Sequence, residues 1–385
     1  MTTLIFSYGY PPADGGIEVY SAGIANGLWE QGESVVVLAP HFVGCETLDI
    51  RQPFPIYRVP AMLFLREWCM LLFLPWLVRK HKVDRILNTV WLPCGSISWL
   101  VTRLLRIPYF ISAHGSEILD TQNLKNPLKH MVRKRLRWLK IITLRNACAI
   151  FAVSEFTRHL VISQGISPDR VFTILNGVDT KRFRPLDDVA WVRSKHNLKG
   201  CKVILTLGRL DDYKGHDTVI RALPQILKEV PQAVYLIVGR GSEKEKLERL
   251  AEEEKVSEHV VFAGYVPDEE IVSYYNVCDV FVMISRQDNK DMEGFGLVYL
   301  EANACKKAVI GGDSGGVRDA IVHGETGLLV DPLDTKAVAH AIIHLLSNHD
   351  EALRMGKNGL QRVENELDWV SVAKRIWLIM ERVAA

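Results

Sequence analysis

The pattern of apolar residues along the chain alternates short β-branched runs with longer helical repeats. Four runs in the first half predict strands: LIFSY, SVVVLAP, DRILNTVW and PYFISAHG. Five runs in the second half predict strands in the same way: KVILTLGRL, AVYLIVGRG, HVVFAGYV, VFVMIS and KAVIGGD. Strands that are separated by one helix each indicate parallel βαβ units with right-handed crossovers. The sequence therefore predicts an α/β fold with two doubly wound parallel-sheet domains.

The boundary between these domains is predicted near Asp179 to Gly200, where FRPLDD and a polar helix separate VFTILNGV from KVILTL. We therefore expect one domain over residues 1–180 and a second over residues 181–367. The amphipathic final helix, about 368–385, is a candidate to pack back on the first domain. Open α/β sheets bind ligands beyond the carboxyl ends of their strands, so we expect two domains facing across a cleft that holds the site.

Composition is that of an ordinary soluble globular protein, with 48% hydrophobic and 24% charged residues. Seven scattered cysteines without a CxxC pair favour reduced thiols over a disulfide framework or a zinc site. The N-terminus lacks the features of a signal peptide. The apolar run WCMLLFLPWLV is too short to span a bilayer and contains Pro75, so it predicts a core or interfacial helix. A cytoplasmic protein is expected.

Basic residues are concentrated in one segment without acids. Eight Lys and Arg residues and no Asp or Glu lie between Asp120 and Glu155. NPLKHMVRKRLRWLKIITLRN predicts a basic amphipathic helix, which is typical of a helix on the cytoplasmic, anionic face of a membrane. The residues expected to form this membrane or acceptor surface are Arg133, Lys134, Arg137, Trp138 and Lys140. A solvated face of a packed helix is the alternative, and nucleic acid is less favoured because no base-stacking platform accompanies the run.

Two loops at predicted strand ends suit a phosphate. Gly15 and Gly16 precede a helix, where exposed backbone N–H groups can bind an anion, although a plain tight turn would look the same. Arg209 and Lys214 lie between a strand and a helix, where two cations would stabilise a diphosphate leaving group; solvated loop charges are the alternative. No GxGxxG follows the first strand and no GxxxxGK[ST] occurs, which argues against a dinucleotide oxidoreductase and a P-loop NTPase.

The stretch EGFGLVYLE places Glu293 and Glu301 eight residues apart around a glycine-rich turn. Gly294 and Gly296 allow a ligand to approach the backbone, and the amides of Gly296 and Leu297 open a helix whose positive end suits phosphate. Each carboxylate would then bind hydroxyl groups of a polyol. An amphipathic helix with one solvated Glu is the alternative.

With these motifs the chain resembles the large retaining glycosyltransferase family 4 (glycosyl transferases group 1), which implies the GT-B fold of two Rossmann-like domains. Glu293 and Glu301 match its E-x7-E motif. The resemblance covers essentially the whole length through YPPADGGIEVY, SAHGSE, VSEFTR, ILNGVDTKRF, LGRLDDYKG, VGRGSEKEKLE, FAGYV, EGFGLVYLEANAC and GGDSGGVRDAIVHGETGLLVDP.

The resemblance implies roles for single residues. The first domain is expected to bind the acceptor and the second the nucleotide sugar. The catalytic candidates are His114, which approaches sugar and acceptor, Glu293, Arg209 and Lys214. The donor-binding candidates are Gly15, Gly16, Arg209, Lys214, Tyr265, Val266, Glu293, Gly294, Phe295, Gly296, Leu297 and Glu301. Among them Arg209 and Lys214 are implied to hold the diphosphate, Glu301 the ribose, and the backbone of Tyr265 and Val266 the base.

The implied reaction transfers a hexose from a nucleotide diphosphate sugar with retention of configuration. No cofactor and no metal are implied, and the chain contains no DxD triplet. SGGVRDA beside EGFGLVYLEA favours GDP-mannose over UDP-glucose, UDP-galactose or UDP-N-acetylglucosamine. The basic helix favours a lipid-linked or glycan acceptor of cell-envelope synthesis, such as a phospholipid or a polyprenyl-diphosphate glycan. A sugar-nucleotide 2-epimerase and a non-catalytic nucleotide-sugar-binding protein are the alternatives, and oligomeric state is not predicted.

Overall fold

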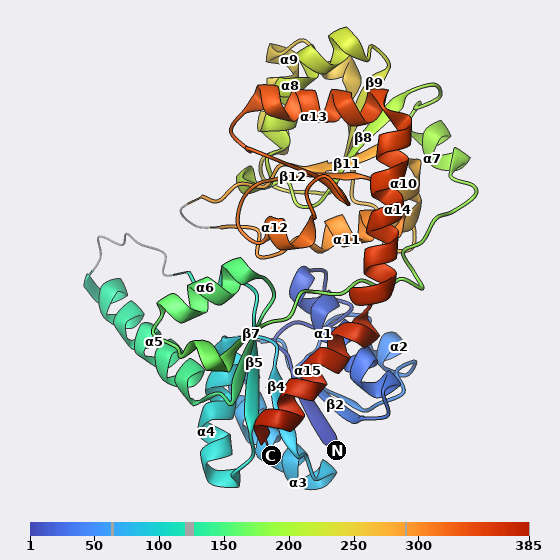
Figure 1. Ribbon diagram of the computed structural model, residues 1–385. Coiled ribbons are helices and arrows are strands. Elements are labelled where there is room, and N and C mark those ends of the chain that lie inside the picture. Colours follow the sequence, from blue (N-terminus) through green and yellow to red (C-terminus); the bar gives the residue numbers. More distant parts are fainter. Residues whose placement is uncertain (63–64, 120–126, 289–290, 385) are drawn as a thin grey trace. The chain divides into compact units, whose positions relative to one another are not determined.

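The computed structural model describes residues 1–385 except 63–64, 120–126, 289–290 and 385, and describes only the backbone of 127–134 and 384. The chain divides into two compact units (Figure 1). The first unit comprises Met1–Gly177 and Trp369–Ala385, and the second comprises Val178–Asp368. The chain therefore passes between the units twice, after Gly177 and after Asp368, and its last helix belongs to the first unit.

The first unit contains a parallel sheet of seven strands in the order β3-β2-β1-β4-β5-β6-β7. The strands are β1 (Thr2–Phe6), β2 (Ser34–Pro40), β3 (Ile56–Val59), β4 (Arg85–Asn88), β5 (Tyr109–Ala113), β6 (Ala149–Ala152) and β7 (Val171–Thr173). The α-helices are α1 (Gly16–Glu30), α2 (Cys45–Asp49), α3 (Leu65–His81), α4 (Ser96–Leu105), α5 (Pro127–Asn146), α6 (Glu155–Ser163) and α15 (Trp369–Ala384). The strand order reverses between β1 and β4, which is where such sheets bind ligands.

The second unit contains a parallel sheet of six strands in the order β10-β9-β8-β11-β12-β13. The strands are β8 (Lys202–Leu207), β9 (Ala233–Val238), β10 (Val260–Gly264), β11 (Val280–Met283), β12 (Val309–Gly312) and β13 (Gly327–Val330). The α-helices are α7 (Ala190–Lys195), α8 (His216–Glu229), α9 (Lys244–Glu253), α10 (Ile271–Val277), α11 (Leu297–Ala304), α12 (Val317–Ala320), α13 (Thr335–Ser347) and α14 (His349–Glu366). Here the strand order reverses between β8 and β11.

The predicted α/β class with two parallel sheets is confirmed. Central strands such as Leu4–Phe6 and Val203–Leu205 are buried along their length, because helices cover both faces of a parallel sheet. The sequence pattern did not predict β3, β6, β7 and β13, which have three or four residues each. The equally short β4, β11 and β12 were predicted because they lie within longer apolar runs. All seven cysteines lie in the described residues and are free thiols.

Helix α15 returns to the first unit and packs against α1 (Figure 1). The two helices approach closely because α1 carries glycines in the contact: a Cβ at Gly23 would lie 2.2 Å from the Trp369 ring, and one at Gly27 would lie 2.4 Å from the Trp369 carbonyl oxygen. The buried Arg85 of β4 donates to Glu33 (2.9 Å) and to Glu381 of α15 (2.5 Å). The last helix is therefore an integral part of the first unit.

Candidate active site

The second unit places its predicted cations directly after β8. Arg209 is exposed and forms an ion pair with Asp211 at 3.1 Å. Lys214 is mostly buried, and its Nζ lies 2.6 Å from Oε2 of Glu293. Burial disfavours the charge on Lys214, but the Glu293 carboxylate and Tyr213 outweigh it, so the pKa of Lys214 is raised. Lys214 is therefore a firmly held cation, and it meets a carboxylate that follows the neighbouring strand β11.

The loop that carries Lys214 is held in place by residues that the sequence reasoning missed. Buried His216 contacts the Arg209 carbonyl through Nε2 and the Tyr235 hydroxyl through Nδ1, both at 3.2 Å. Burial lowers the pKa of His216 to about 4, so the imidazole is neutral. Gly215 has φ +73°, and a Cβ there would lie 1.9 Å from the Ile284 carbonyl oxygen. Only glycine fits this position.

Arg286 fixes the same loop from the side of β11. Its guanidinium pairs with Asp217 at 2.9 Å and with Asp212 at 3.1 Å, and its backbone N–H donates to the Tyr213 carbonyl at 2.8 Å. Arg286 appears in the sequence only as a charged residue after an apolar run. Asp217 lies 69 residues earlier in the chain and Asp212 lies earlier still, so no local sequence pattern indicates these ion pairs.

The glycine-rich turn before α11 has the predicted form. Gly296 caps α11 with φ +93°, and a Cβ there would lie 2.5 Å from the Tyr299 ring. The Phe295 side chain is buried in the core, so a ligand at this turn would contact mainly the backbone of Phe295. Gly315 of the SGGVRDA motif has φ +56°, and the Gly316 N–H donates to the Glu293 carbonyl at 2.9 Å. This contact explains why the two motifs occur together: one turn holds the other.

Glu301 lies within α11 and accepts a hydrogen bond of 2.6 Å from the Tyr275 hydroxyl. Burial raises the pKa of Glu301, and the Tyr275 hydrogen bond opposes this effect. Tyr275 was missed by the sequence reasoning, because it lies 26 residues earlier, on α10. The solvated-helix alternative for Glu301 does not fit, since the carboxylate is held by a specific donor.

The loop after β10, at the edge of this sheet, carries Tyr265 and Val266. The Val266 side chain is buried, whereas Tyr265 is exposed and the Arg240 guanidinium lies 4.9 Å from its ring centre. The exposed ring with a cation over it is a surface on which a planar group can stack. Tyr265 follows β10, which is separated from β8 by one strand, β9, in the sheet order.

The first unit places three of the predicted residues at the carboxyl edge of its own sheet. His114 follows β5; its Nε2 lies 2.8 Å from the Thr89 carbonyl oxygen, and its backbone N–H donates to Glu117 at 2.5 Å. Burial lowers the pKa of His114. Gly15 and Gly16 follow β1 and begin α1. A Cβ on Gly15 would lie 2.2 Å from a carboxylate oxygen of Glu18. Glu18 was not among the predicted site residues, and it places a negative group against this loop.

In the second unit, Lys214 after β8 and Glu293 after β11 meet where the strand order reverses, whereas Tyr265 and Val266 follow the edge strand β10. Two family models match the chain: Glycosyltransferase Family 4 over residues 14–182 and Glycosyl transferases group 1 over residues 190–362. A GDP-mannose-dependent alpha-(1-6)-phosphatidylinositol monomannoside mannosyltransferase of Mycolicibacterium smegmatis is 32% identical over 97% of this chain and 96% of its own. The chain belongs to glycosyltransferase family 4. It is a glycosyltransferase, and the resemblance seen in the sequence is confirmed.

Other relatives and solved structures agree with this assignment. A GDP-mannose-dependent monoacylated alpha-(1-6)-phosphatidylinositol monomannoside mannosyltransferase of Corynebacterium glutamicum is 28% identical over 98% of this chain and 97% of its own. The structure of Anabaena HepE in complex with UDP matches with a TM-score of 0.82 at 20% identity, covering 99% of this chain and 100% of that chain. These matches confirm the GT-B fold of the glycosyltransferase.

The predicted membrane surface on α5 is partly wrong. Lys140 is buried and donates to the Ile118 carbonyl at 2.9 Å, because it lies on the side of α5 that faces the core of its unit. Arg137 and Trp138 are exposed, and the Trp138 ring meets Trp99 of α4 edge-on at 6.3 Å. The side chains of Arg133 and Lys134 lie outside the described residues. Among helices of the described chain, none is long and apolar enough to cross a membrane.

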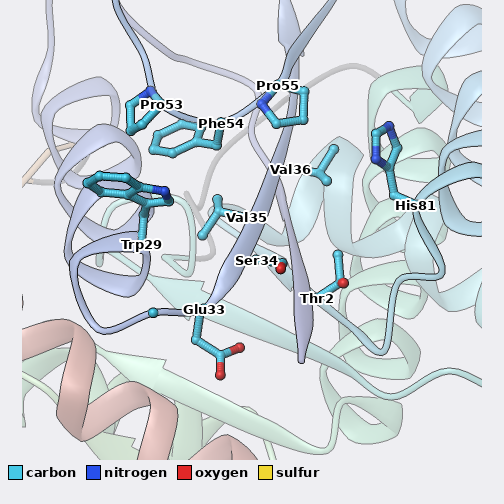
Figure 2. Close-up of a pocket in the computed structure, with 11 residues that line it drawn as sticks. Thr2, Trp29, Glu33, Ser34, Val35, Val36, Pro53, Phe54, Pro55 and His81 are labelled. Carbon is cyan, nitrogen blue, oxygen red and sulfur yellow. The ribbon is translucent and has the colours of Figure 1, made fainter.

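A hollow of about 550 Å³ in the first unit lies at the amino ends of its strands, opposite the carboxyl edge that carries Gly15, Gly16 and His114. Thr2 and Ser34, the first residues of β1 and β2, line it, and Figure 2 shows Trp29 and Phe54 on one side and His81 on the other. Its carboxylate, Glu33, is already bonded to Arg85 and to Trp377. The glycosyltransferase motifs contribute nothing to this hollow, so we do not assign it to the candidate active site.

Proposed function

We propose that this glycosyltransferase transfers mannose from GDP-mannose, with retention of configuration, to a hydroxyl of a phosphatidylinositol-linked or similar lipid-linked acceptor in cell-envelope glycolipid synthesis. The observation that carries the proposal is the similarity, over nearly the whole chain, to mannosyltransferases whose names specify this donor and a phosphatidylinositol mannoside. The second unit would bind the nucleotide sugar, and the first unit would bind the acceptor.

The donor would bind where the second unit concentrates its charges. Arg209 and Lys214 follow β8 and supply positive charge for the diphosphate. As the bond to the anomeric carbon loosens, the leaving GDP gains negative charge, and preorganised cations stabilise it most at that moment. Lys214 is already held by Glu293 at 2.6 Å, so little reorganisation is needed to orient the ammonium. Glu293 and the backbone of Gly294 to Leu297 would then contact the transferred sugar.

The remaining donor contacts follow from residues with fixed surroundings. Glu301, oriented by Tyr275, would accept hydrogen bonds from the two ribose hydroxyls. The loop of Tyr265 and Val266 would bind the base. Gly15 and Gly16, with His114, would approach the phosphate and sugar from the first unit's own sheet edge.

We propose that the reaction needs no divalent metal, because Arg209 and Lys214 supply the charge that a metal would bring to the diphosphate. Among the described residues, one group has metal-ligand atoms within 4.8 Å of one another: His41, Cys45 and Glu46, at the carboxyl end of β2 in the first unit. Activity that survives a chelator, and that is also unchanged in Cys45→Ala, would support a metal-free transfer. Loss of activity in EDTA that Mg²⁺ restores would refute it.

The acceptor side is supported by an apolar surface on α3 that the charge pattern alone did not indicate. Trp68, Leu72 and Trp76 expose between 46% and 70% of their surface, while Met70 and Leu74 of the same helix are buried. Exposed Arg79 and Lys80 follow at the end of α3. Aromatic and aliphatic side chains next to cations fit the interface of an anionic bilayer. We therefore propose a peripheral protein on the cytoplasmic face of the membrane.

Helix α4 extends this surface, because it packs against both α3 and α5. It exposes Leu100 and Leu104, and Arg103 lies over the Trp99 ring at 5.5 Å. A Trp68→Gln, Leu72→Gln double variant is expected to lose most binding to vesicles of phosphatidylglycerol in a sedimentation assay. Leu353→Gln, which changes an exposed leucine of the second unit, is the control and should bind as the wild type does. Equal binding of both would remove α3 from the membrane surface.

The reaction can be tested by mixing the purified protein with GDP-mannose, UDP-glucose, UDP-galactose or UDP-N-acetylglucosamine. Each donor is tested with vesicles that contain or lack phosphatidylinositol mannoside. GDP release from GDP-mannose that requires the lipid, with a product heavier by one hexose in mass spectrometry, is the expected result. Cleavage of the product by an α-mannosidase would support retention. Consumption of a UDP-sugar alone would overturn the donor assignment, and epimerisation without acceptor would identify a 2-epimerase.

A further inference from the structure

We propose that Tyr20 and Trp369 are positioning residues that orient the imidazole of His114, so that its Nδ1 is presented as a hydrogen-bond acceptor. The three rings come from α1, from the first residue of α15 and from the end of β5, and all belong to the first unit. The inference rests on the proposed function, in which His114 approaches the sugar and the acceptor. It gives Tyr20 and Trp369 a positioning role that the sequence motifs do not assign to them.

The hydrogen bond of His114 determines which nitrogen carries the proton. Nε2 lies 2.8 Å from the Thr89 carbonyl oxygen, which can only accept. Nε2 must therefore be the donor, and in the neutral imidazole Nδ1 then has the free lone pair. The lowered pKa of His114, caused by burial, agrees with a neutral ring. An Nδ1 acceptor can receive a hydrogen bond from a hydroxyl group, such as one of the sugar or the acceptor.

Tyr20 holds the plane of this imidazole. The two ring centres are 4.8 Å apart and the rings are nearly perpendicular, at 86°. The Tyr20 hydroxyl is 2.8 Å from Oγ of Ser112, which lies two residues before His114 on β5. The Tyr20 ring is thus tied to the same strand end that carries the histidine. A ring turned by 180° would lose the bond to Thr89 and place a carbon where Nδ1 was.

Trp369 holds Tyr20 in turn. Its ring meets Tyr20 edge-on at 5.9 Å and 82° and rests on Gly23, where a Cβ would lie 2.2 Å away. Both Tyr20 and Trp369 are buried. Tyr20 therefore cannot turn away from His114 unless Trp369 moves. Trp369 follows directly on Asp368, where the chain re-enters the first unit.

The test uses the full-length protein labelled with ¹⁵N-histidine, with the His114 signals assigned by a His114→Gln variant. Long-range ¹H–¹⁵N spectra report the tautomer. We expect the Nε2–H form in the wild type and in Tyr20→Phe, which keeps the ring. In Tyr20→Leu and Trp369→Leu we expect averaged tautomer signals, and a kcat that falls about 30-fold with the KM for GDP-mannose within about twofold.

Three outcomes would overturn the proposal. An Nδ1–H tautomer in the wild type overturns the proposal without any variant, so it stays testable if Tyr20→Leu does not fold. A folded Tyr20→Leu protein with unchanged tautomer and kcat also overturns it, as does a kcat loss in Tyr20→Leu that Phe at the same position does not restore. If GDP-mannose is not a donor, the proposed function fails, whereas the tautomer measurement still decides the role of Tyr20.

Discussion

The two units share one architecture, a doubly wound parallel sheet whose strand order reverses near the middle, yet they place different chemistry at the carboxyl edge. In the second unit this edge holds paired charges, with Lys214 against Glu293 and Arg286 between Asp212 and Asp217. In the first unit it holds a neutral imidazole, His114, packed on an aromatic ring. The same backbone crevice can thus serve an anionic diphosphate in one unit and neutral hydroxyl groups in the other.

The largest expected effect removes the buried cation of the second unit. Lys214→Ala should lower kcat/KM for GDP-mannose by about 10²- to 10³-fold, because the leaving diphosphate loses a preorganised charge. GDP release measures this. Lys246→Ala is the matched control, since Lys246 is an exposed lysine that pairs with Asp212 and Glu243 and should leave the rate nearly unchanged. Equal rates for Lys214→Ala and the wild type would remove the contrast between the units.

The next effect concerns the turn that carries this cation. Gly215→Ala should destabilise the protein by about 3 kcal/mol or more, because a Cβ would clash with the Ile284 carbonyl at 1.9 Å in addition to the strain of φ +73°. Gly200→Ala has nearly the same φ, +77°, and no atom within 4 Å of its Cβ, so only about 1 kcal/mol of backbone strain is expected. Urea unfolding compares the two. Similar costs would mean that the close approach to Ile284 is not needed.

A smaller effect is expected from the neutral histidine beneath the turn. Burial lowers the pKa of His216 to about 4 in the folded protein, from its ordinary value of 6.5. The folded state therefore resists protonation, so stability from this residue is complete above pH 6.5 and is lost as the pH falls toward 4. Between pH 7 and pH 4.5 the free energy of unfolding of the wild type should fall by about 2 to 3 kcal/mol more than that of His216→Gln, as measured by urea unfolding at each pH. Exposed His340→Gln is the control and should keep the wild-type pH dependence.

The smallest effect tests the orientation of Glu301. Tyr275→Phe removes the hydroxyl that donates to Oε2, and we expect the KM for GDP-mannose to rise about fivefold to tenfold with a smaller change in kcat. Tyr274→Phe is a control on the same helix, because the Tyr274 hydroxyl contacts His196 and not Glu301. If both variants have the wild-type KM, Tyr275 does not orient a donor-binding group, and the second unit relies less on fixed carboxylates than the comparison implies.

Predictions from the sequence succeeded where the signal is local. The alternation of β-branched runs and helical repeats predicts two parallel-sheet α/β domains, because the spacing of apolar residues within each segment determines its secondary structure. The turn at Gly296 and the cap of α11 follow from adjacent glycines, and the eight-residue spacing of Glu293 and Glu301 lies within one segment. These features need no knowledge of what packs against them.

The tertiary structure alone decided which distant residues meet. The pairing of Lys214 with Glu293 spans 79 residues, and the Tyr20–Trp369 contact joins the first helix to the last. The buried side of α5 could not be predicted from its charges, so Lys140 was wrongly assigned to the surface. The physical reason is that periodicity specifies which residues share a face, whereas burial of that face depends on strand order and on the partner helices, which are distant in the sequence.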